Sequence, residues 1–180
     1  SGENMTDWYG VWITADNVTV RGFTVKGCNL SGILISSNHT TISDTIVSHN
    51  KNNGITIGSL NVSQPYDCRE NTIRNCLIGH NLLGLFVSGQ NAIITGNVLS
   101  QNNLGITVIF SMNNNISHNQ ITQDTNGVYI AGSYHTVLYR NNISYNDKGV
   151  YAMMTSADNI IQNNFIGNNE SASSAQMFLI

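Results

Sequence analysis

The sequence is poor in charge, and this scarcity limits the partners it can have. Only 9% of its 180 residues are Asp, Glu, Lys or Arg, and the formal net charge is −3. The seven Lys and Arg residues are scattered singly and form no basic stripe that could neutralise phosphates. We therefore expect no nucleic-acid partner. No apolar run approaches the ~20 residues that cross a bilayer, so we also expect no membrane span in this chain.

Cysteine and proline are scarce as well. The three cysteines, Cys28, Cys68 and Cys76, form no Cys-x-x-Cys pair. Cys68 and Cys76 could form a disulfide, or all three could be small buried thiols, and the sequence leaves both alternatives open. The N-terminal Ser-Gly-Glu-Asn is no signal peptide, so the signal of an exported protein would have been removed or lie outside this sequence.

Asparagine, glycine and apolar residues take the place of charge, and they recur with a period of about 22 residues. Glycines stand at 10, 32, 54, 84, 105, 127 and 149, and each has apolar residues one and three positions later. One polar column comprises Asn75, Asn97, Asn119, Asn141 and Asn163, with apolar residues at 77, 99, 121, 143 and 165. A second comprises Asn81, Asn102, Asp124, Asn146 and Asn168. Self-similarity at this period predicts a solenoid.

Each repeat has room for three strands of three to five residues joined by tight turns, which closes one coil of a parallel β-helix. We predict about seven such coils over residues 10–169. Residues 1–9 would be an N-terminal cap or the end of a preceding coil, and residues 170–180 a C-terminal cap strand. The recurrent asparagines would satisfy backbone groups at the turns and bond one another as a structural ladder. A leucine-rich repeat fits less well, because the Leu-x-x-Leu-x-Leu block and a helical segment are missing.

The motif Asn-x-Ile-x-x-Asn-x-x-Gly-Ile-x-Ile, at 97–108 and with small changes at 119–130 and 141–152, resembles the β-helix repeats of the NosD-like family. These CASH-type modules are common in surface proteins of bacteria and methanogenic archaea. The resemblance implies a right-handed, pectin-lyase-like β-helix that is extracellular, on the cell surface or periplasmic. It leaves several roles open, including sugar binding, sugar hydrolysis, surface-layer structure and help in maturing a copper centre.

An outward column beside the buried positions carries several aromatic residues. It comprises Trp12, Leu34, Thr56, Phe86, Thr107, Tyr129 and Tyr151. Stacked aromatic rings could hold sugars or pack against a flanking domain or subunit. We therefore predict a binding face at Trp12, Phe86, Tyr129 and Tyr151. The apolar end of the chain also suggests end-to-end or lateral self-association.

Catalytic and metal-binding candidates are few. The coil from Gly54 to Gly84 is 30 residues long and carries the acidic residues Asp67 and Glu70 beside Arg69, which could serve a polysaccharide lyase, hydrolase or epimerase. His49 and His80 occupy equivalent turn positions and could bind Cu or Zn, although no third ligand is indicated. We expect no resident cofactor.

Asn-x-Ser/Thr sequons mark candidate glycosylation sites at Asn4, Asn17, Asn38, Asn61, Asn115, Asn142 and Asn169. Taken together, the sequence favours a non-catalytic extracellular or cell-surface module that is structural or binds carbohydrate or protein. The alternatives are a carbohydrate-active enzyme and a copper-site maturation accessory protein.

Overall fold

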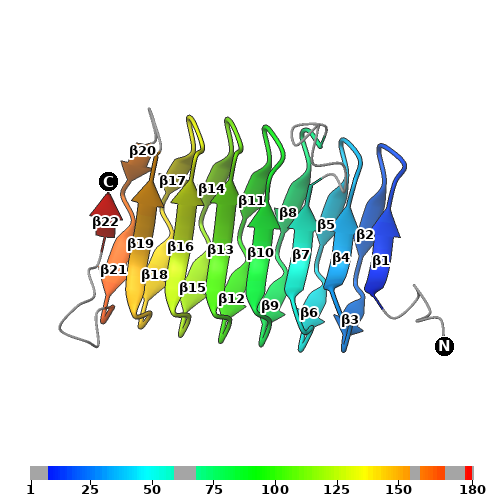
Figure 1. The fold of residues 1–180 in the computed structure, drawn as a ribbon, viewed down its shortest axis with the longest axis horizontal. Helices are drawn as coiled ribbons and strands as arrows, with labels where there is room; N and C mark the ends of the chain where they lie inside the picture. Colours follow the sequence, from blue (N-terminus) through cyan, green and yellow to red (C-terminus); the bar gives the residue numbers. More distant parts are fainter. Residues whose placement is uncertain (1–7, 59–67, 155–158, 169–176, 180) are drawn as a thin grey trace.

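The chain folds as a right-handed parallel β-helix (Figure 1). The computed structural model describes residues 8–58, 68–154, 159–168 and 177–179. Within these residues three parallel sheets, here called A, B and C, run along the helix axis, and each coil contributes one strand to each sheet. The predicted fold class is therefore confirmed. No helix in the described part of the chain is long and apolar enough to cross a membrane.

The strands of each sheet are in parallel register with their copies one coil away. Sheet A contains β1 (Tyr9–Ile13), β4 (Ser31–Ile35), β7 (Asn53–Ile57), β10 (Leu83–Val87), β13 (Leu104–Ile109), β16 (Asn126–Ala131), β19 (Lys148–Met153) and β22 (Met177–Leu179). Sheet B contains β2 (Thr19–Arg21), β5 (Thr41–Ser43), β8 (Thr72–Arg74), β11 (Ile93–Thr95), β14 (Asn115–Ser117), β17 (Val137–Tyr139) and β20 (Asn159–Ile161). Sheet C contains β3 (Thr24–Lys26), β6 (Ile46–Ser48), β9 (Leu77–Gly79), β12 (Val98–Ser100), β15 (Gln120–Thr122), β18 (Asn142–Ser144) and β21 (Asn164–Ile166).

The core is a column of β-branched and leucine side chains that fills the bore of the helix. In one coil, Ile33 and Ile35 enter from sheet A, Ile42 from sheet B and Val47 from sheet C, and all four are fully buried. Equivalent residues repeat in the coils above and below. β-branched side chains suit this position because they pack tightly on a pleated, buried surface.

Three corners join the sheets, and each contains at least one residue with a left-handed backbone; the later corners from A to B have a further one at Phe110 or Gly132. The corner from A to B uses Asn17, His39, Glu70, Asn91, Asn113 and His135. The corner from B to C uses Gly22, Asp44, Asn75, Gly96, His118, Arg140 and Gln162, and the corner from C to A uses Gly27, His49, His80, Gln101, Gln123, Tyr145 and Gly167. Glycine adopts this conformation freely and asparagine readily, whereas the other residues are held there by the stack.

Coil length corrects one part of the predicted repeat. Sheet B pairs Thr72 with Ile93, 21 residues later, although the next step, from Ile93 to Asn115, is 22. Asn75 therefore does not join the asparagine column, because Cys76 occupies that position and donates its backbone N–H to Asn97 Oδ1 at 2.9 Å.

The same shift affects the adjoining apolar column. Ile78 is the buried partner of Leu99, and Leu77 is exposed on the outside of sheet C. Strand β1 begins at Tyr9, and β22, in the segment expected to be a cap, pairs in parallel with β19.

Candidate functional site

The asparagine ladders fix the corners from the inside. At the corner from C to A, the backbone N–H and Nδ2 of Asn81 both donate to Asn102 Oδ1 at 3.1 Å, and Nδ2 of Asn102 donates to the carbonyl of Ile78. The same pattern links Asn50, Asn81, Asn102, Asp124, Asn146 and Asn168 in order. At the corner from B to C it links Asn97, Asn119, Asn141 and Asn163. These amides are consumed internally, so they serve structure rather than ligand binding.

Asp124 is the exception in its ladder. Its Oδ1 accepts hydrogen bonds from the backbone N–H of Asn102 at 2.7 Å and from Asn102 Nδ2 at 3.1 Å. Its Oδ2 is buried and has no hydrogen-bond partner. Burial raises the pKa of Asp124 to about 7, against the two hydrogen bonds from Asn102, which lower it. With one oxygen bonded inside the ladder and the other enclosed, this carboxyl cannot reach a substrate.

The outer face of sheet A carries the predicted aromatic column in register. Trp12 pairs with Leu34, Phe86 with Thr107, and Thr107 with Tyr129. The large residues shield the small ones, since Thr107 between Phe86 and Tyr129 is only 1% exposed. Trp12, 46% exposed, projects furthest of the four predicted contact residues. The column is therefore a closely packed apolar surface rather than a row of separate rings.

Tyr129 and Tyr151 show how the rings of this column are oriented. They stack with centroids 5.7 Å apart and planes 6° from parallel. Strands of a sheet are ~4.8 Å apart along the same direction, so the ring faces lie against one another. The sides of the two rings that face each other are therefore covered, which suits packing against protein better than binding sugar.

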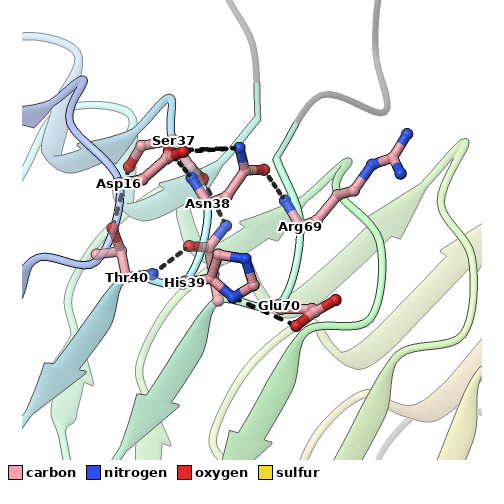
Figure 2. A network of polar contacts seen from close by, with 8 residues as sticks. Asp16, Ser37, Asn38, His39, Thr40, Arg69 and Glu70 are labelled. Atoms are coloured by element: carbon pink, nitrogen blue, oxygen red, sulfur yellow. Dashed lines mark hydrogen bonds and ion pairs between the residues drawn. The ribbon is translucent and has the colours of Figure 1, made fainter.

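The predicted catalytic cluster is divided by the structure. Figure 2 shows Glu70 paired with His39, with Oε2 and Nδ1 3.2 Å apart. The backbone N–H of Arg69 donates to Asn38 Oδ1, and Asn38 in turn donates its own N–H to Asp16 Oδ1 at 2.7 Å (Figure 2). Asp67 lies outside the described residues. Glu70 and the neighbouring Asp16 therefore hold an exposed corner together, and neither faces another carboxylate in this network.

A hollow of about 290 Å³ opens at the corner from C to A, toward the C-terminal end of the helix. It is lined by Asn102, Gln123, Asp124, Thr125, Tyr145 and Asp147. Gln123 and Tyr145 are left-handed corner residues of successive coils, and Thr125 and Asp147 directly follow the two ladder residues. The hollow thus lies between two columns of exposed side chains with the buried ladder beneath it. No sequence motif predicted this hollow.

His49 and His80 do lie together at the same corner, in coils nearer the N-terminal end of the helix. Their rings stack with centroids 4.4 Å apart and planes 23° from parallel, and both side chains are exposed. In a parallel stack the nitrogen lone pairs point side by side rather than toward one shared ion. A metal held at the usual ~2.0–2.1 Å from each nitrogen would require both rings to turn.

The family assignment follows from the sequence itself. The family model described as "Periplasmic copper-binding protein (NosD)" matches residues 64–177, well over half of the chain. This chain belongs to the NosD family. No curated protein matches its sequence.

Solved structures share the fold of this NosD-family chain. The enzymatically active domain of tailspike protein 2 from bacteriophage CBA120 aligns with a TM-score of 0.71 at 18% identity, over 93% of this chain and 27% of its own. Pectate lyase Pel9A aligns with a TM-score of 0.64 at 13% identity, over 96% of this chain and 61% of its own. The periplasmic alginate epimerase AlgG aligns with a TM-score of 0.64 at 19% identity, over 96% of this chain and 47% of its own. The chain thus spans less than two thirds of each of these proteins, and identities this low establish the fold alone.

The family description implies copper, but the described residues do not fit a resident copper ion. All five histidines and all three cysteines are among them, and no three His, Cys, Asp or Glu side chains in this part of the chain gather around one point. Beyond the stacked His49 and His80, His39 is engaged by Glu70 and His118 packs edge-on against Tyr139. Two parallel imidazoles are fewer ligands than a protein copper site normally uses.

The cysteines are free thiols in the NosD-family chain, so the disulfide between Cys68 and Cys76 is not formed. Both are buried, and their Sγ atoms donate to backbone carbonyls, Cys68 to Ile35 at 3.6 Å and Cys76 to Arg74 at 3.3 Å. Burial raises the pKa of the Cys76 thiol. These thiols therefore behave as small core residues.

The sequons differ in their surroundings. Asn17 and Asn115 are exposed, whereas Asn38 uses its amide to bond Asp16 and Arg69. Asn142 is half-buried on sheet C, with its Oδ1 enclosed. The remaining candidates, Asn4, Asn61 and Asn169, lie outside the described residues.

Proposed function

We propose that this NosD-family chain is a non-catalytic carbohydrate-binding module that acts in the periplasm or outside the cell. The observation that carries the proposal is the neutral hydrogen-bonding surface of the central coils. From Asn75 to Gln123 the sequence contains no Asp, Glu, Lys or Arg, and the exposed corner positions there include amides and imidazoles, such as Gln101 and His80. Such groups both donate to and accept from sugar hydroxyls, and the location agrees with the family description.

The carboxylates of the described residues support binding over catalysis. Glycoside hydrolysis uses two carboxyl groups ~5–9.5 Å apart across the scissile bond. Asp16, Asp44 and Glu70 are bonded to Asn38, Arg21 and His39 respectively. Asp124 is enclosed in its ladder, so Asp147 is the one described acidic residue that is exposed and has no hydrogen bond or ion pair from its side chain. Two structural neighbours are named for the polysaccharides pectate and alginate, in line with a sugar ligand.

A polysaccharide panel tests this function. The purified protein is expected to be retarded in gels that contain at least one soluble polysaccharide, and to release no reducing ends or unsaturated products from any of them. The proposal is contradicted if the protein binds no polysaccharide of the panel, or if it degrades one of them. Equilibrium dialysis against Cu and Zn, with His49→Ala and His80→Ala as variants, separates the copper alternative. We expect no stoichiometric metal binding that depends on these two histidines.

The outer face of sheet A is proposed to meet protein, as a contact for a flanking domain or subunit. The parallel stack of Tyr129 and Tyr151 and the burial of Thr107 between its neighbours support packing. Light scattering of the wild type and of Tyr129→Ser with Tyr151→Ser measures any self-association through this face. An equal mass for both proteins at all concentrations would exclude a second copy as the occupant.

A further inference from the structure

The corner from C to A brings together side chains that are free to meet a ligand. The ladder residues Asn102 and Asp124 are buried beneath it, while the residues just before and just after them remain exposed. One column of exposed residues comprises His49, His80, Gln101, Gln123 and Tyr145, and the other comprises Lys51, Leu82, Asn103, Thr125 and Asp147. Because each coil repeats the geometry, both columns extend along the helix axis at ~4.8 Å per coil.

The hollow lies where these two columns pass Gln123, Tyr145, Thr125 and Asp147. Its volume of about 290 Å³ is at the lower end of the ~300–1,000 Å³ typical of ligand clefts. A space of this size accommodates one ring of a larger ligand and leaves the remainder in contact with the surface. A chain-like ligand would continue along the corner toward Gln101.

Tyr145 supplies an exposed aromatic ring on one side of the hollow. The side chain is 57% exposed and has a left-handed backbone. Its ring lies directly against Gly167, where a β-carbon would come within 2.7 Å of Cδ1 and Cε1. The ring can occupy this position because residue 167 has no side chain, and the rest of the ring is available to a ligand. Exposed aromatic rings on polar surfaces are typical contacts for the apolar faces of sugars.

The polar groups around the ring are oriented but not consumed. Gln101 Nε2 donates to Gln123 Oε1 at 3.2 Å, which leaves the Nε2 hydrogens of Gln123 for a ligand. The backbone N–H groups of Thr125 and Asp147 are fixed by the carbonyls of Asn103 and Asp124. Among the hydrogen bonds and ion pairs of the described residues, none uses the Thr125 hydroxyl or the Asp147 carboxylate. The hollow thus offers the Nε2 group of Gln123, a hydroxyl and a carboxylate that have no hydrogen-bond partner among the described residues.

Charge limits the class of ligand. Asp147 contributes an exposed negative charge, and no Lys or Arg lines the hollow. The nearest basic residue in sequence, Lys148, points elsewhere, with its Nζ 5.2 Å from the centre of the Tyr151 ring on sheet A. A ligand carboxylate would therefore be repelled, whereas ligand hydroxyls could donate to Asp147 and accept from Gln123.

We infer that the hollow binds one residue of a neutral polysaccharide, and that the glycan chain runs along the corner across Gln101 toward His80. This inference rests on the proposed carbohydrate binding and adds both the site and the class of sugar. It differs from the aromatic column of sheet A, which lies on a neighbouring face.

Affinity electrophoresis tests the site with soluble xylan, galactomannan and mixed-linkage β-glucan as neutral probes, and with polygalacturonate and alginate as acidic ones. We expect the wild type to bind at least one neutral probe and to bind the acidic probes more weakly. Tyr145→Ala should weaken neutral binding at least 10-fold, and Gln123→Ala should weaken it several-fold. The matched control is Tyr134→Ala, which removes another exposed tyrosine, 42% exposed against 57% for Tyr145, from the corner between A and B.

The charge argument has its own variant. Asp147→Asn should strengthen binding of polygalacturonate relative to the wild type. Thermal unfolding of each variant shows that the fold is retained. If the wild type binds neutral glycans but Tyr145→Ala and Gln123→Ala bind as well as Tyr134→Ala does, the site is wrong and carbohydrate binding stands. If the acidic probes bind more tightly than the neutral ones, the sugar class is wrong. If no probe binds, both the site and the proposed function fail.

Discussion

Replacing Asp124 with asparagine should stabilise the protein, and increasingly so as the pH rises. In this ladder Asn102 and Asn146 each donate Nδ2 to a backbone carbonyl in the preceding coil, those of Ile78 and Ile121 respectively. The carbonyl at the equivalent position for residue 124 is that of Leu99, which is the register partner of both Ile78 and Ile121. A carboxylate oxygen cannot donate to it, which explains why Asp124 Oδ2 is buried without a partner.

The sign of the effect follows from where the proton is held. Burial raises the folded-state pKa of Asp124 to about 7 from its ordinary 3.8. Between these values the folded protein keeps a proton that the unfolded chain releases, so stability falls as the pH rises. The contribution of the protonated acid is fully present below about pH 3.8 and is lost as the pH passes through about 7.

The magnitude can be worked from the same shift. A difference of about 3 pKa units corresponds to ~4 kcal/mol, which we take as an upper limit because local relaxation would reduce it. Asp124→Asn removes this loss and restores a donor toward Leu99. We expect the variant to be roughly 2–4 kcal/mol more stable than the wild type at pH 8 and within about 1 kcal/mol of it at pH 4.

Urea unfolding followed by far-ultraviolet circular dichroism, at intervals from pH 4 to pH 8, measures this difference. The wild-type midpoint should fall over this range more steeply than that of the variant. Asp147→Asn is the control, since it removes an exposed carboxylate from the adjoining coil and should leave the slope unchanged. Parallel midpoint curves for wild type and Asp124→Asn, or a variant that is less stable at pH 8, would refute the reasoning.

Two further predictions concern the ladders and the thiols. Asn119→Ala removes the acceptor of Asn97 and the donor to Ile94 and Asn141, and should lower the unfolding free energy by roughly 3 kcal/mol in urea titrations. Asn75→Gly should change the unfolding free energy by less than about 0.5 kcal/mol, because Asn75 lies outside the ladder and Gly96 adopts the same left-handed backbone at the equivalent corner. If Asn75→Gly and Asn119→Ala lowered the unfolding free energy equally, Asn75 would have to be a ladder residue. Iodoacetamide followed by mass spectrometry should modify only the half-buried Cys28 in the native protein and all three thiols in denaturant. Unmodified Cys68 and Cys76 in denaturant without reductant would instead reveal a disulfide.

The fold could be predicted because several signals in each coil agree. Alternating apolar residues after Gly32, Gly105 and Gly127 mark the strands of sheet A, and asparagines mark the corners. Each signal alone is weak, since strands of three residues resemble many loops. Their repetition is informative because a solenoid coil buries its apolar face only against its copies.

The register of Asn75 was wrong for a physical reason. The 22-residue period is built in two ways along the chain. Early coils place seven residues from the start of a sheet C strand to the next sheet A strand, as from Ile46 to Asn53, and later coils place six, as from Val98 to Leu104. The later coils have one residue more between the start of a sheet A strand and the next sheet B strand, as from Leu104 to Asn115, and β13 is six residues long. The coil between Thr72 and Ile93 has neither extra residue, so it is 21 residues long and the spacing from Asn75 to Asn97 was a coincidence.

The candidate site was beyond sequence reasoning for a different reason. Gln123 and Tyr145 are 22 residues apart and share no motif, and only the stack brings them next to Thr125 and Asp147. The aromatic column was found because its members share one position in the repeat. The same logic placed His49 and His80 at equivalent turn positions, but the column that directly follows the ladder residues, with Thr125 and Asp147, was not recognised.

The position before each ladder residue explains how one repeat can carry both structure and function. A ladder residue must offer an oxygen and a donor to its neighbours, and Asp124 shows that even a change from amide to acid leaves an enclosed oxygen unpaired. The residue before it needs only to adopt a left-handed backbone, and its side chain points outward. His80, Gln101 and Tyr145 all satisfy this condition at the same corner. The ladder therefore confines chemical variety to the columns beside it, so a ligand of this chain should be sought there, along the corner and across several coils.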